Sequence, residues 1–312
     1  MWFACLTLLR RSVPAPRRGG AAALALCALL GACSFAPVAP PTPVPLPEPK
    51  PPVLRAPKIG LALGGGAARG FAHIGVIQVL EENGIKPDLV VGTSAGSLVA
   101  ALYASGHTGR ELGLLADSMD ETAITDWSFP YRGLLKGAAL AKYVRDQTGG
   151  RLMEQFPLPL GVVATDLDNG QGVLFRRGDP GTAVRASSAV PAVFQPVKIN
   201  EREYVDGGLV APVPVHYARQ MGADLVIAVD ISSPPEGNPT PDAFRMLLQT
   251  FAIMSRSINQ LELRDADVVL RPKLVNAGSA DFSVRKRSIA IGREAALAVL
   301  PELKAKIAEK TR

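Results

Sequence analysis

The chain has 312 residues with 34 basic and 28 acidic side chains, which gives a formal net charge of +6. Hydrophobic residues make up 47% and charged residues 20%, so a sizeable core can form and global disorder is excluded. Residues 1–32 hold four arginines and no acid, which leaves 30 basic against 28 acidic groups in the remainder. The basic balance therefore belongs to the N-terminus, and together with an aromatic content of only 5% it argues against a nucleic-acid partner.

The N-terminal segment has the pattern of a secretory signal. Residues 21–32, AAALALCALLGA, form an apolar run behind the arginines, shorter than the roughly 20 residues that cross a bilayer. The run ends in LGAC, which resembles a bacterial lipobox and implies a lipoprotein-type signal peptide at 1–32 with lipidation of Cys33. Ser34 favours an anchor in the bacterial cell envelope at the periplasmic face of the outer membrane. The alternative is an ordinary signal peptide cut nearby, with the cysteine incidental.

A proline-rich stretch follows the cysteine. Ten prolines fall within residues 37–57, a composition that favours extended polyproline II and could reach roughly 60 Å. Residues 33–57 are therefore predicted to be a stiff tether, or else a merely disordered linker, and both interpretations begin the folded part at about Lys58. All three cysteines lie within the first 33 residues, so the later chain has no disulfide and no cysteine-based metal site.

From Lys58 onward, short β-like runs alternate with helical runs. Strands are predicted at 59–63, 88–91, 161–165, 173–175 and 225–230. Helices are predicted at 71–83, 97–104, 215–221, 244–263 and 289–309. This alternation predicts an α/β fold in three layers, with a mostly parallel central sheet and helices on both faces.

The sequence Gly92-Thr93-Ser94-Ala95-Gly96 fits the pattern G-x-S-x-G. It follows a predicted strand and precedes a predicted helix, where a sharp turn lifts the serine oxygen clear of the sheet. The flanking glycines are needed because side chains there would collide, and the helix N-terminus favours developing negative charge. The pattern predicts that Ser94 is a nucleophile, against the alternative of a tight turn with a capping serine.

A glycine-rich loop, residues 64–70 with the sequence GGGAARG, occupies the preceding strand-to-helix turn. Such a loop exposes backbone N–H groups and can cradle a phosphate or form an oxyanion hole. A nucleotide-binding loop would need a following Lys-Ser or Lys-Thr, and the dinucleotide spacing G-x-G-x-x-G is absent. Its place 24 to 30 residues before Ser94 favours stabilisation of an acyl tetrahedral intermediate.

Asp206-Gly207-Gly208 follows the hydrophobic Tyr204-Val205, and it is either a simple turn or a base whose approach to the serine is kept open. The chain has three histidines, and a Ser–Asp–His triad would need His216, which falls in a helix-like stretch. His73 and His107 lie in or near helices as well. A Ser–Asp dyad needs no histidine.

The string GGGAARGFAHIGVIQVLEENGIKPDLVVGTSAGSLVAALYASG resembles the opening of the patatin-like phospholipase family, and RASSAVPAVFQPVKINEREYVDGGLVAPVP resembles its second block. The resemblance covers about residues 58–222 and implies a patatin-like three-layer sandwich. It implies a catalytic dyad of Ser94 and Asp206, and an oxyanion hole at Gly65, Gly66 and Ala67. The family motif further includes Gly92, Gly96, Arg69, Gly70, Gly207 and Gly208. Ala67 departs from the family's glycine there, and it would be strained if that position needs a positive φ.

The resemblance also implies a domain plan and an activity. A catalytic domain is expected over 58–230 with a helical C-terminal extension over 231–312 packed on it. The expected activity is acyl-ester hydrolysis of membrane phospholipid or lysophospholipid through an acyl-enzyme, with no metal and no cofactor. A general carboxylesterase or thioesterase, a non-catalytic lipid-binding envelope lipoprotein and, least favoured, a nucleotide-binding protein are the alternatives. Arg69 either holds an anionic substrate group or forms a surface salt bridge. The oligomeric state is not predicted.

Overall fold

The computed structural model describes residues 55–119, 126, 132–274 and 284–311. The predicted signal peptide, Cys33 and nearly all of the proline-rich stretch lie outside the described residues. Residues 52–312 form one compact unit. No helix in the described part of the chain combines the length and the apolar composition that crossing a bilayer requires.

The unit is built on one mixed sheet with the order β10-β9-β1-β2-β4-β8-β7, and β5 pairs separately with β4. The pairs from β10 through β4 are parallel, whereas β5, β7 and β8 join in antiparallel pairs. The strands of this sheet are β1 (Ile59–Leu63), β2 (Leu89–Thr93), β4 (Leu160–Asp166), β5 (Gly172–Phe175), β7 (Val197–Ile199), β8 (Arg202–Asp206), β9 (Leu225–Val229) and β10 (Val268–Leu270). A separate parallel pair consists of β3 (Gly133–Leu135) and β6 (Ala192–Phe194).

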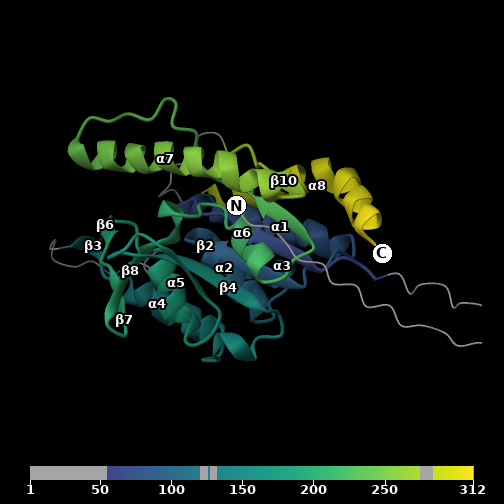
Figure 1. The fold of residues 1–312 in the computed structure, drawn as a ribbon, viewed down its shortest axis with the longest axis horizontal. Helices are drawn as coiled ribbons and strands as arrows, with labels where there is room; N and C mark the ends of the chain where they lie inside the picture. The colour runs from purple at the N-terminus through teal and green to yellow at the C-terminus, as the bar shows by residue number, and fades with distance from the viewer. Residues whose placement is uncertain (1–54, 120–125, 127–131, 275–283, 312) are drawn as a thin grey trace, which may run out of the picture. The chain divides into compact units, whose positions relative to one another are not determined.

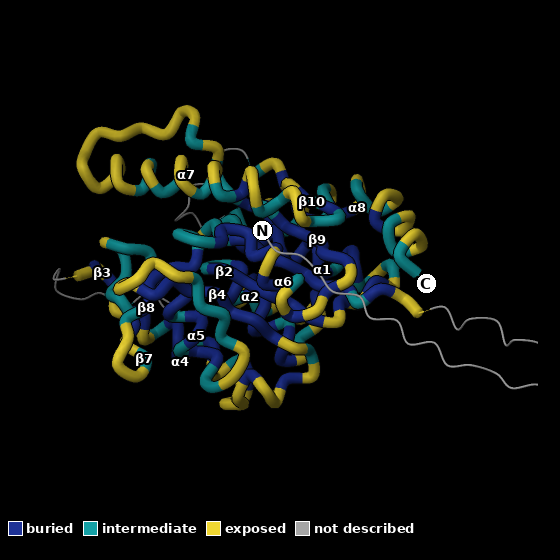
Figure 2. The backbone as a smooth tube through the Cα atoms, in the orientation of Figure 1, coloured by how far each residue is buried: buried dark blue, intermediate teal, exposed yellow. Residues whose placement is uncertain are grey.

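Helices cover both faces of the sheet (Figure 1). They are α1 (Phe71–Glu82), α2 (Ala95–Ala104), α3 (Gly109–Ser118), α4 (Ala138–Gln147), α5 (Pro180–Ser187), α6 (Val215–Gln220), α7 (Ala243–Glu262) and α8 (Arg285–Lys310). Alternate strand residues point to opposite faces. Leu61 and Leu63 pack into the core shared with α1 to α5 and α8, whereas Ala62 packs with α6. The inner strands are consequently packed on both faces, and Figure 2 shows their residues as buried.

The helix ends follow from local sequence. Thr108 and Glu111 form a capping box at the start of α3. The side chain of Asp179 caps α5, with a proline in the first turn, and Asp242 caps α7 through the Arg245 N–H at 2.8 Å. Helix α1 ends before Gly84, whose φ of +71° lies in the left-handed region.

The predicted α/β class with a mostly parallel sheet is confirmed, and each predicted strand and helix is present with ends shifted by at most a few residues. The sequence predicts a helical C-terminal extension over 231–312, and the structure adds one short strand to its two helices. Residues Val268–Leu270 form β10, which pairs with β9 and extends the central sheet. A run of three apolar residues is too short to stand out as a strand without its neighbour.

Helix α8 packs directly on α1 rather than standing off as an appendage. A Cβ added to Gly75 would lie 2.0 Å from Ile289 O, and one added to Gly292 would lie 2.0 Å from Ala72 O. The two helices therefore touch through backbone at glycines on both sides. An ion pair between Arg293 and Glu82, 2.7 Å, lies along the same contact. The C-terminal region is thus part of the core of the unit.

Candidate active site

Ser94 sits on the turn between β2 and α2 in a backbone conformation that L-residues rarely adopt. Its φ is +53° and its ψ is −124°, and α2 begins at the next residue. A Cβ on Gly96 would lie 2.1 Å from Leu63 O, and one on Gly92 would lie 2.4 Å from Gly96 O. Only glycine fits at these two positions, so the steric reason for the G-x-S-x-G pattern is visible. Strained backbone at a reactive serine is typical of a nucleophile turn.

Two strands that run in opposite directions meet on one edge of β4. β2 is parallel to β4 and ends with Thr93 opposite Val163, while β8 is antiparallel and ends with Asp206 opposite Ala164. Both occupy the same edge, because β5 pairs with the other edge of β4 over the same residues. Val163 and Ala164 are adjacent, so the register brings the ends of β2 and β8 together. Ser94 and Asp206, 112 positions apart in sequence, become neighbours in space.

Asp206 is almost fully buried, with 6% of its surface exposed. Its Oδ1 accepts a hydrogen bond from the Gly208 N–H at 2.7 Å. Its Oδ2 has no partner at standard hydrogen-bond geometry among the described residues. The Ser94 hydroxyl is nevertheless near enough to lower the pKa of the carboxyl group.

Burial raises the pKa of Asp206 to about 6, and the Gly208 N–H and the Ser94 hydroxyl oppose the shift. A carboxylate with a pKa near neutrality is a stronger base than an ordinary aspartate. The site therefore places a serine with a strained backbone beside a carboxyl group whose pKa lies near neutrality.

The glycine-rich loop lies beside the serine. A Cβ on Gly65 would be 3.9 Å from Ser94 Oγ. The Gly65 N–H, however, donates to Pro212 O at 2.9 Å, so in this conformation Gly65 is not available as the predicted oxyanion donor. Neither the Gly66 nor the Ala67 N–H donates to another described residue. Those two amides are the ones free to meet an oxyanion.

Ala67 has a φ of +50°, the left-handed conformation that favours glycine. Ala67 thus replaces the family's glycine at a position where a glycine would relieve backbone strain. Strain at this point is consistent with a loop held for function rather than for stability.

Arg69 lines the cavity that holds Ser94, and its guanidinium bonds to the segment after β9. Its Nε donates to Ile231 O at 2.8 Å and its Nη1 to Ser233 Oγ at 2.5 Å. Burial lowers the pKa of Arg69, and nearby Asp230 partly offsets that effect. The guanidinium therefore ties the glycine-rich loop to the segment after β9. Binding of an anionic substrate group by Arg69 stays a prediction.

The remaining motif glycines mark close backbone approaches around the pair. A Cβ on Gly207 would lie 2.2 Å from Val163 O, and one on Gly208 would lie 2.9 Å from Asp206 Oδ1. A Cβ on Gly70 would lie 2.9 Å from Ala95 Cβ, at the start of α2. These contacts hold Asp206, the glycine-rich loop and the turn at Ser94 against one another.

None of the three histidines bonds to Ser94 or Asp206 in the described chain. The Nε2 of His73 lies 2.8 Å from Gly64 O, and burial lowers the pKa of His73 to about 4. The Nε2 of His107 lies 2.9 Å from Gln147 O, and the Nδ1 of His216 lies 2.6 Å from Glu262 Oε1. His216 does not line the cavity that holds Ser94. The arrangement favours a dyad over a triad.

Ser94 and Asp206 open into a cavity of about 440 Å³. Its floor is the glycine-rich loop and the two catalytic candidates, and one wall is α7, through residues that include Leu248, Phe251 and Met254. The cavity lies at the carboxyl end of β2, where ligands bind in open α/β sheets.

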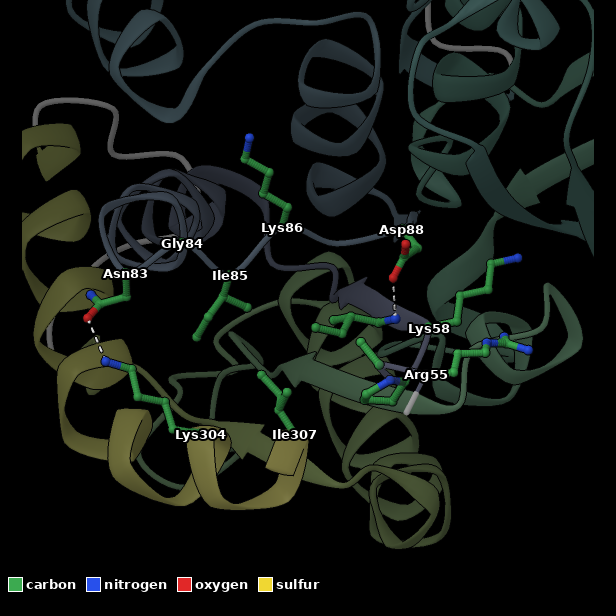
Figure 3. A pocket seen from close by; sticks show the side chains of 12 residues that line it. Arg55, Lys58, Asn83, Gly84, Ile85, Lys86, Asp88, Lys304 and Ile307 are labelled. Carbon is green, nitrogen blue, oxygen red and sulfur yellow. Dashed lines mark hydrogen bonds between the residues drawn. The ribbon is translucent and has the colours of Figure 1, made fainter. Parts of the chain in front are cut away.

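A second hollow, of about 600 Å³, lies at the opposite end of the sheet, around the start of β1 (Figure 3). It is lined by the turn 83–88 and by α8. Its one acid, Asp88, accepts the Ile59 N–H at 2.6 Å, and its Asn83 accepts from Lys304 at 3.1 Å. Both side chains are thus used in hydrogen bonds within the fold, and the residues that line the hollow include no nucleophile paired with a base.

Ser187 is a site residue that the sequence analysis missed. Its buried hydroxyl accepts the Ser94 N–H at 2.9 Å and donates to Val163 O at 2.5 Å. It therefore joins the nucleophile turn to β4. The signal lay in the RASSAV stretch, but nothing local distinguishes one of its serines from the other.

Ser187→Ala is expected to lower kcat for a short soluble ester about tenfold with little change in KM, because the nucleophile turn loses its tie to the sheet. The lost bonds should also cost about 1–3 kcal/mol of unfolding free energy. Kinetics and urea unfolding check both. Ser188→Ala is the matched control, since the Ser188 hydroxyl makes no hydrogen bond in the described residues. Equal effects from the two variants would contradict the role of Ser187.

Hydrolysis is expected to slow at acidic pH with a midpoint near 6. Asp206 must be unprotonated to act as a base, and burial raises its pKa to about 6. The rate should be level above the midpoint and fall tenfold per pH unit below it. Values of kcat/KM for a soluble ester from about pH 4.5 to about pH 8.5 test this. His73, with a pKa of about 4, titrates too low to produce this limb. A midpoint below 5 would argue against Asp206 as the base.

Comparison with known proteins agrees with this geometry. A family model for patatin-like phospholipase matches residues 61–219, just over half of the chain. An uncharacterized NTE family protein of Mycobacterium tuberculosis is 39% identical over 191 residues, which cover 60% of this chain and 52% of that protein. Patatin-like phospholipase domain-containing protein 6 of Mus musculus is 34% identical over 192 residues, covering 59% and 14%. The chain thus spans about half the length of the mycobacterial relative.

Among solved structures, VipD from Legionella pneumophila aligns with a TM-score of 0.51 at 15% identity, covering 80% of this chain and 67% of that one. At this identity the likeness concerns the fold alone. A nucleophile turn on a mostly parallel sheet, with a glycine-rich loop beside it, defines an α/β protein of the patatin-like class. The chain belongs to the patatin-like phospholipase family.

Proposed function

We propose that this chain is a serine acyl hydrolase of membrane lipids, of the phospholipase A or lysophospholipase type, with Ser94 as nucleophile and Asp206 as base. The observation that carries the proposal is the meeting of β2 and β8 on one edge of β4, beside the Gly66 and Ala67 amides, which have no partner among the described residues. Membership of the patatin-like phospholipase family supports a lipid-ester substrate.

In the acylation half of the reaction, Ser94 Oγ attacks the ester carbonyl carbon and its proton passes to Asp206 Oδ2. The carbonyl oxygen becomes an oxyanion, which the Gly66 and Ala67 N–H groups stabilise by about 3 kcal/mol each. Collapse of the tetrahedral intermediate breaks the bond to the alcohol oxygen. That oxygen takes the proton from Asp206 and leaves, and the acyl group remains on Ser94 as an ester.

In the deacylation half, Asp206 accepts a proton from a water molecule as that water attacks the acyl carbonyl. The same two amides hold the second oxyanion. Its collapse returns the proton to Ser94 Oγ and releases the fatty acid. The raised pKa of Asp206 suits it to accept and return a proton in both halves.

Labelling with a fluorophosphonate probe tests the proposal directly. The probe should attach covalently to Ser94 in the full chain, and mass spectrometry of the labelled peptide should place it there. Ser97, which donates to Ser94 O at 2.6 Å inside α2, provides the matched control through Ser97→Ala, which should still be labelled. Absence of labelling in the folded protein would favour the lipid-binding alternative and overturn the proposal.

We further propose that the chain is anchored through lipidated Cys33 at the periplasmic face of the outer membrane. The support is the apolar run and the lipobox-like LGAC that precede Ser34. Metabolic labelling with palmitate should be lost in Cys33→Ala and retained in Cys27→Ala, whose cysteine lies within the apolar run. Retained labelling in Cys33→Ala would contradict the anchor.

A further inference from the structure

Helix α7 leaves a large part of its apolar surface in solvent. Eleven large hydrophobic side chains in the described residues are substantially exposed, and six of them lie on this one helix. They are Phe244, Met246, Leu247, Ile253, Met254 and Leu261, with exposed fractions between 37% and 64%. Asn259 is the one buried residue of α7. Figure 2 shows the helix and the loop before it as mostly exposed. An apolar cluster of this kind marks an interaction surface.

Five of the six exposed side chains share one side of the helix, and Phe244 lies outside it. Leu247, Met254 and Leu261 repeat every seven residues and so form a single stripe, and Met246 and Ile253 form a second stripe beside it. We call this side the α7 arc. It consists of Ala243, Met246, Leu247, Thr250, Ile253, Met254, Ser257 and Leu261. No charged residue lies in the arc, because Arg245, Arg256 and Glu262 project from other sides of the helix.

The α7 arc borders the catalytic cavity. Leu248 and Phe251 line the cavity, and Met254 both lines it and belongs to the arc. An apolar path therefore continues from the outer side of α7 into the space that holds Ser94. A chain entering along this path would meet no charged group of the arc.

The polar side of α7 holds its own loop. Gln249 donates to Pro235 O at 2.6 Å and accepts from Asn238 at 2.8 Å, and Arg256 pairs with Glu236. The far end is fastened by Glu262, whose carboxylate meets His216 on α6 at 2.6 Å. These bonds orient the helix so that the arc stays uncovered by the loop. Figure 1 shows α7 running along one side of the unit, with this loop arching past it.

A lipid surface fits the α7 arc better than a folded protein partner. A protein that covered the arc would also cover the cavity beside it, whereas a lipid surface supplies the ester that the cavity must receive. Arg245 adds charge complementarity at the cavity wall. Its guanidinium has no hydrogen bond or ion pair within the described residues, so it is free to meet a lipid phosphate. An uncharged apolar arc on one side of a helix that carries charged residues on its other sides is typical of a helix that lies in a membrane interface.

We propose that α7 docks the enzyme on the lipid surface, with the α7 arc inserted among the acyl chains and the mouth of the cavity facing phospholipid esters. The inference rests on the proposed function for its substrate. Docking itself needs no turnover, so it is tested apart from the chemistry.

The test measures binding of the full chain to vesicles of phosphatidylcholine and phosphatidylglycerol by co-sedimentation. Ser94→Ala prevents hydrolysis and Cys33→Ala removes any lipid anchor in every sample. Leu247→Gln and Leu261→Gln should each weaken binding about tenfold, since an inserted leucine side chain gains roughly that much from leaving water. Leu114→Gln on α3 and Leu297→Gln on α8 are matched controls of similar exposure and should bind as the parent does.

A second measurement uses Ser94-intact enzyme. The α7 variants should hydrolyse vesicle phospholipid more slowly by the same factor. Their rate of hydrolysis of a short soluble ester should stay that of the parent. Unchanged vesicle binding in the α7 variants, or an equal loss in the α3 and α8 controls, would overturn the docking role. A dimer that dissociates in the α7 variants, with vesicle binding unaltered, would show that a second copy of the chain covers the arc instead. Failure of the chemistry would appear separately, as hydrolysis that survives Ser94→Ala.

Discussion

Asp206→Asn is expected to abolish ester hydrolysis and at the same time to make the protein more stable. The amide cannot accept the Ser94 proton, so kcat should fall about 10³-fold or more, and Ser94→Ala should fall at least as far. The amide oxygen can still accept the Gly208 N–H, so the local structure should persist. A short fluorogenic ester provides the assay.

The gain in stability follows from burial of the charged carboxylate. The folded-state pKa of Asp206 is about 6 against an ordinary value of 3.8, so folding disfavours its charged form. At pH 8 this penalty is roughly 3 kcal/mol, which Asp206→Asn removes, and the melting temperature should rise by about 5 °C.

The pH dependence of that gain provides the control. Because the folded pKa is raised, the stability associated with Asp206 is present below about pH 4 and is lost as the pH rises through about 6. The advantage of Asp206→Asn should therefore be full above pH 6 and shrink toward zero near pH 4. A variant that is inactive and also less stable at every pH would indicate a structural role for Asp206 instead.

Gly96→Ala is expected to destabilise the protein by about 3 kcal/mol or more and to abolish activity. The new Cβ would lie 2.1 Å from Leu63 O and 2.7 Å from Gly64 O, and neither backbone atom can move without displacing β1 or the glycine-rich loop. Urea unfolding and the ester assay measure the two losses.

Gly113→Ala is the matched control for that substitution, because Gly113 also lies within a helix. Its Cβ would meet only the end of the flexible Gln78 side chain, at 3.1 Å. The helix should gain about 0.5–1 kcal/mol from the alanine, with activity retained. If the two variants were equally stable, the close contact between Gly96 and the backbone of Leu63 would not be what requires glycine at position 96.

Much of the local architecture could be predicted because it depends on short stretches of chain. The apolar run of β1, the periodicity of α1 and the strand–turn–helix around Ser94 each carry their signal within a dozen residues. The missed helices α3, α4 and α5 are more polar and lie in the region where the predicted elements are sparse. Strand β10 has only three residues, and it exists because β9 offers it an edge.

The candidate donors show the limit of prediction from motifs. The glycine-rich loop lies between β1 and α1 as predicted, but the Gly65 N–H is taken by Pro212, 147 residues later. The hydroxyl that holds the nucleophile turn comes from Ser187 on α5. Hydrogen bonds across such separations leave no periodic trace in the sequence.

The amino-acid sequence by itself indicated the turn at Ser94, because Gly92 is required by the carbonyl of Gly96 within the same five residues, whereas the requirement for glycine at 96 comes from Leu63 on β1. The tertiary structure decided everything that needs two distant segments. Asp206 lies beside Ser94 only because β2 and β8 reach one edge of β4 from opposite directions. Helix α7 becomes a cavity wall because its polar side is bonded to the preceding loop and its C-terminal end to α6. Strand register and helix placement depend on the packing of the whole core, which no local pattern encodes.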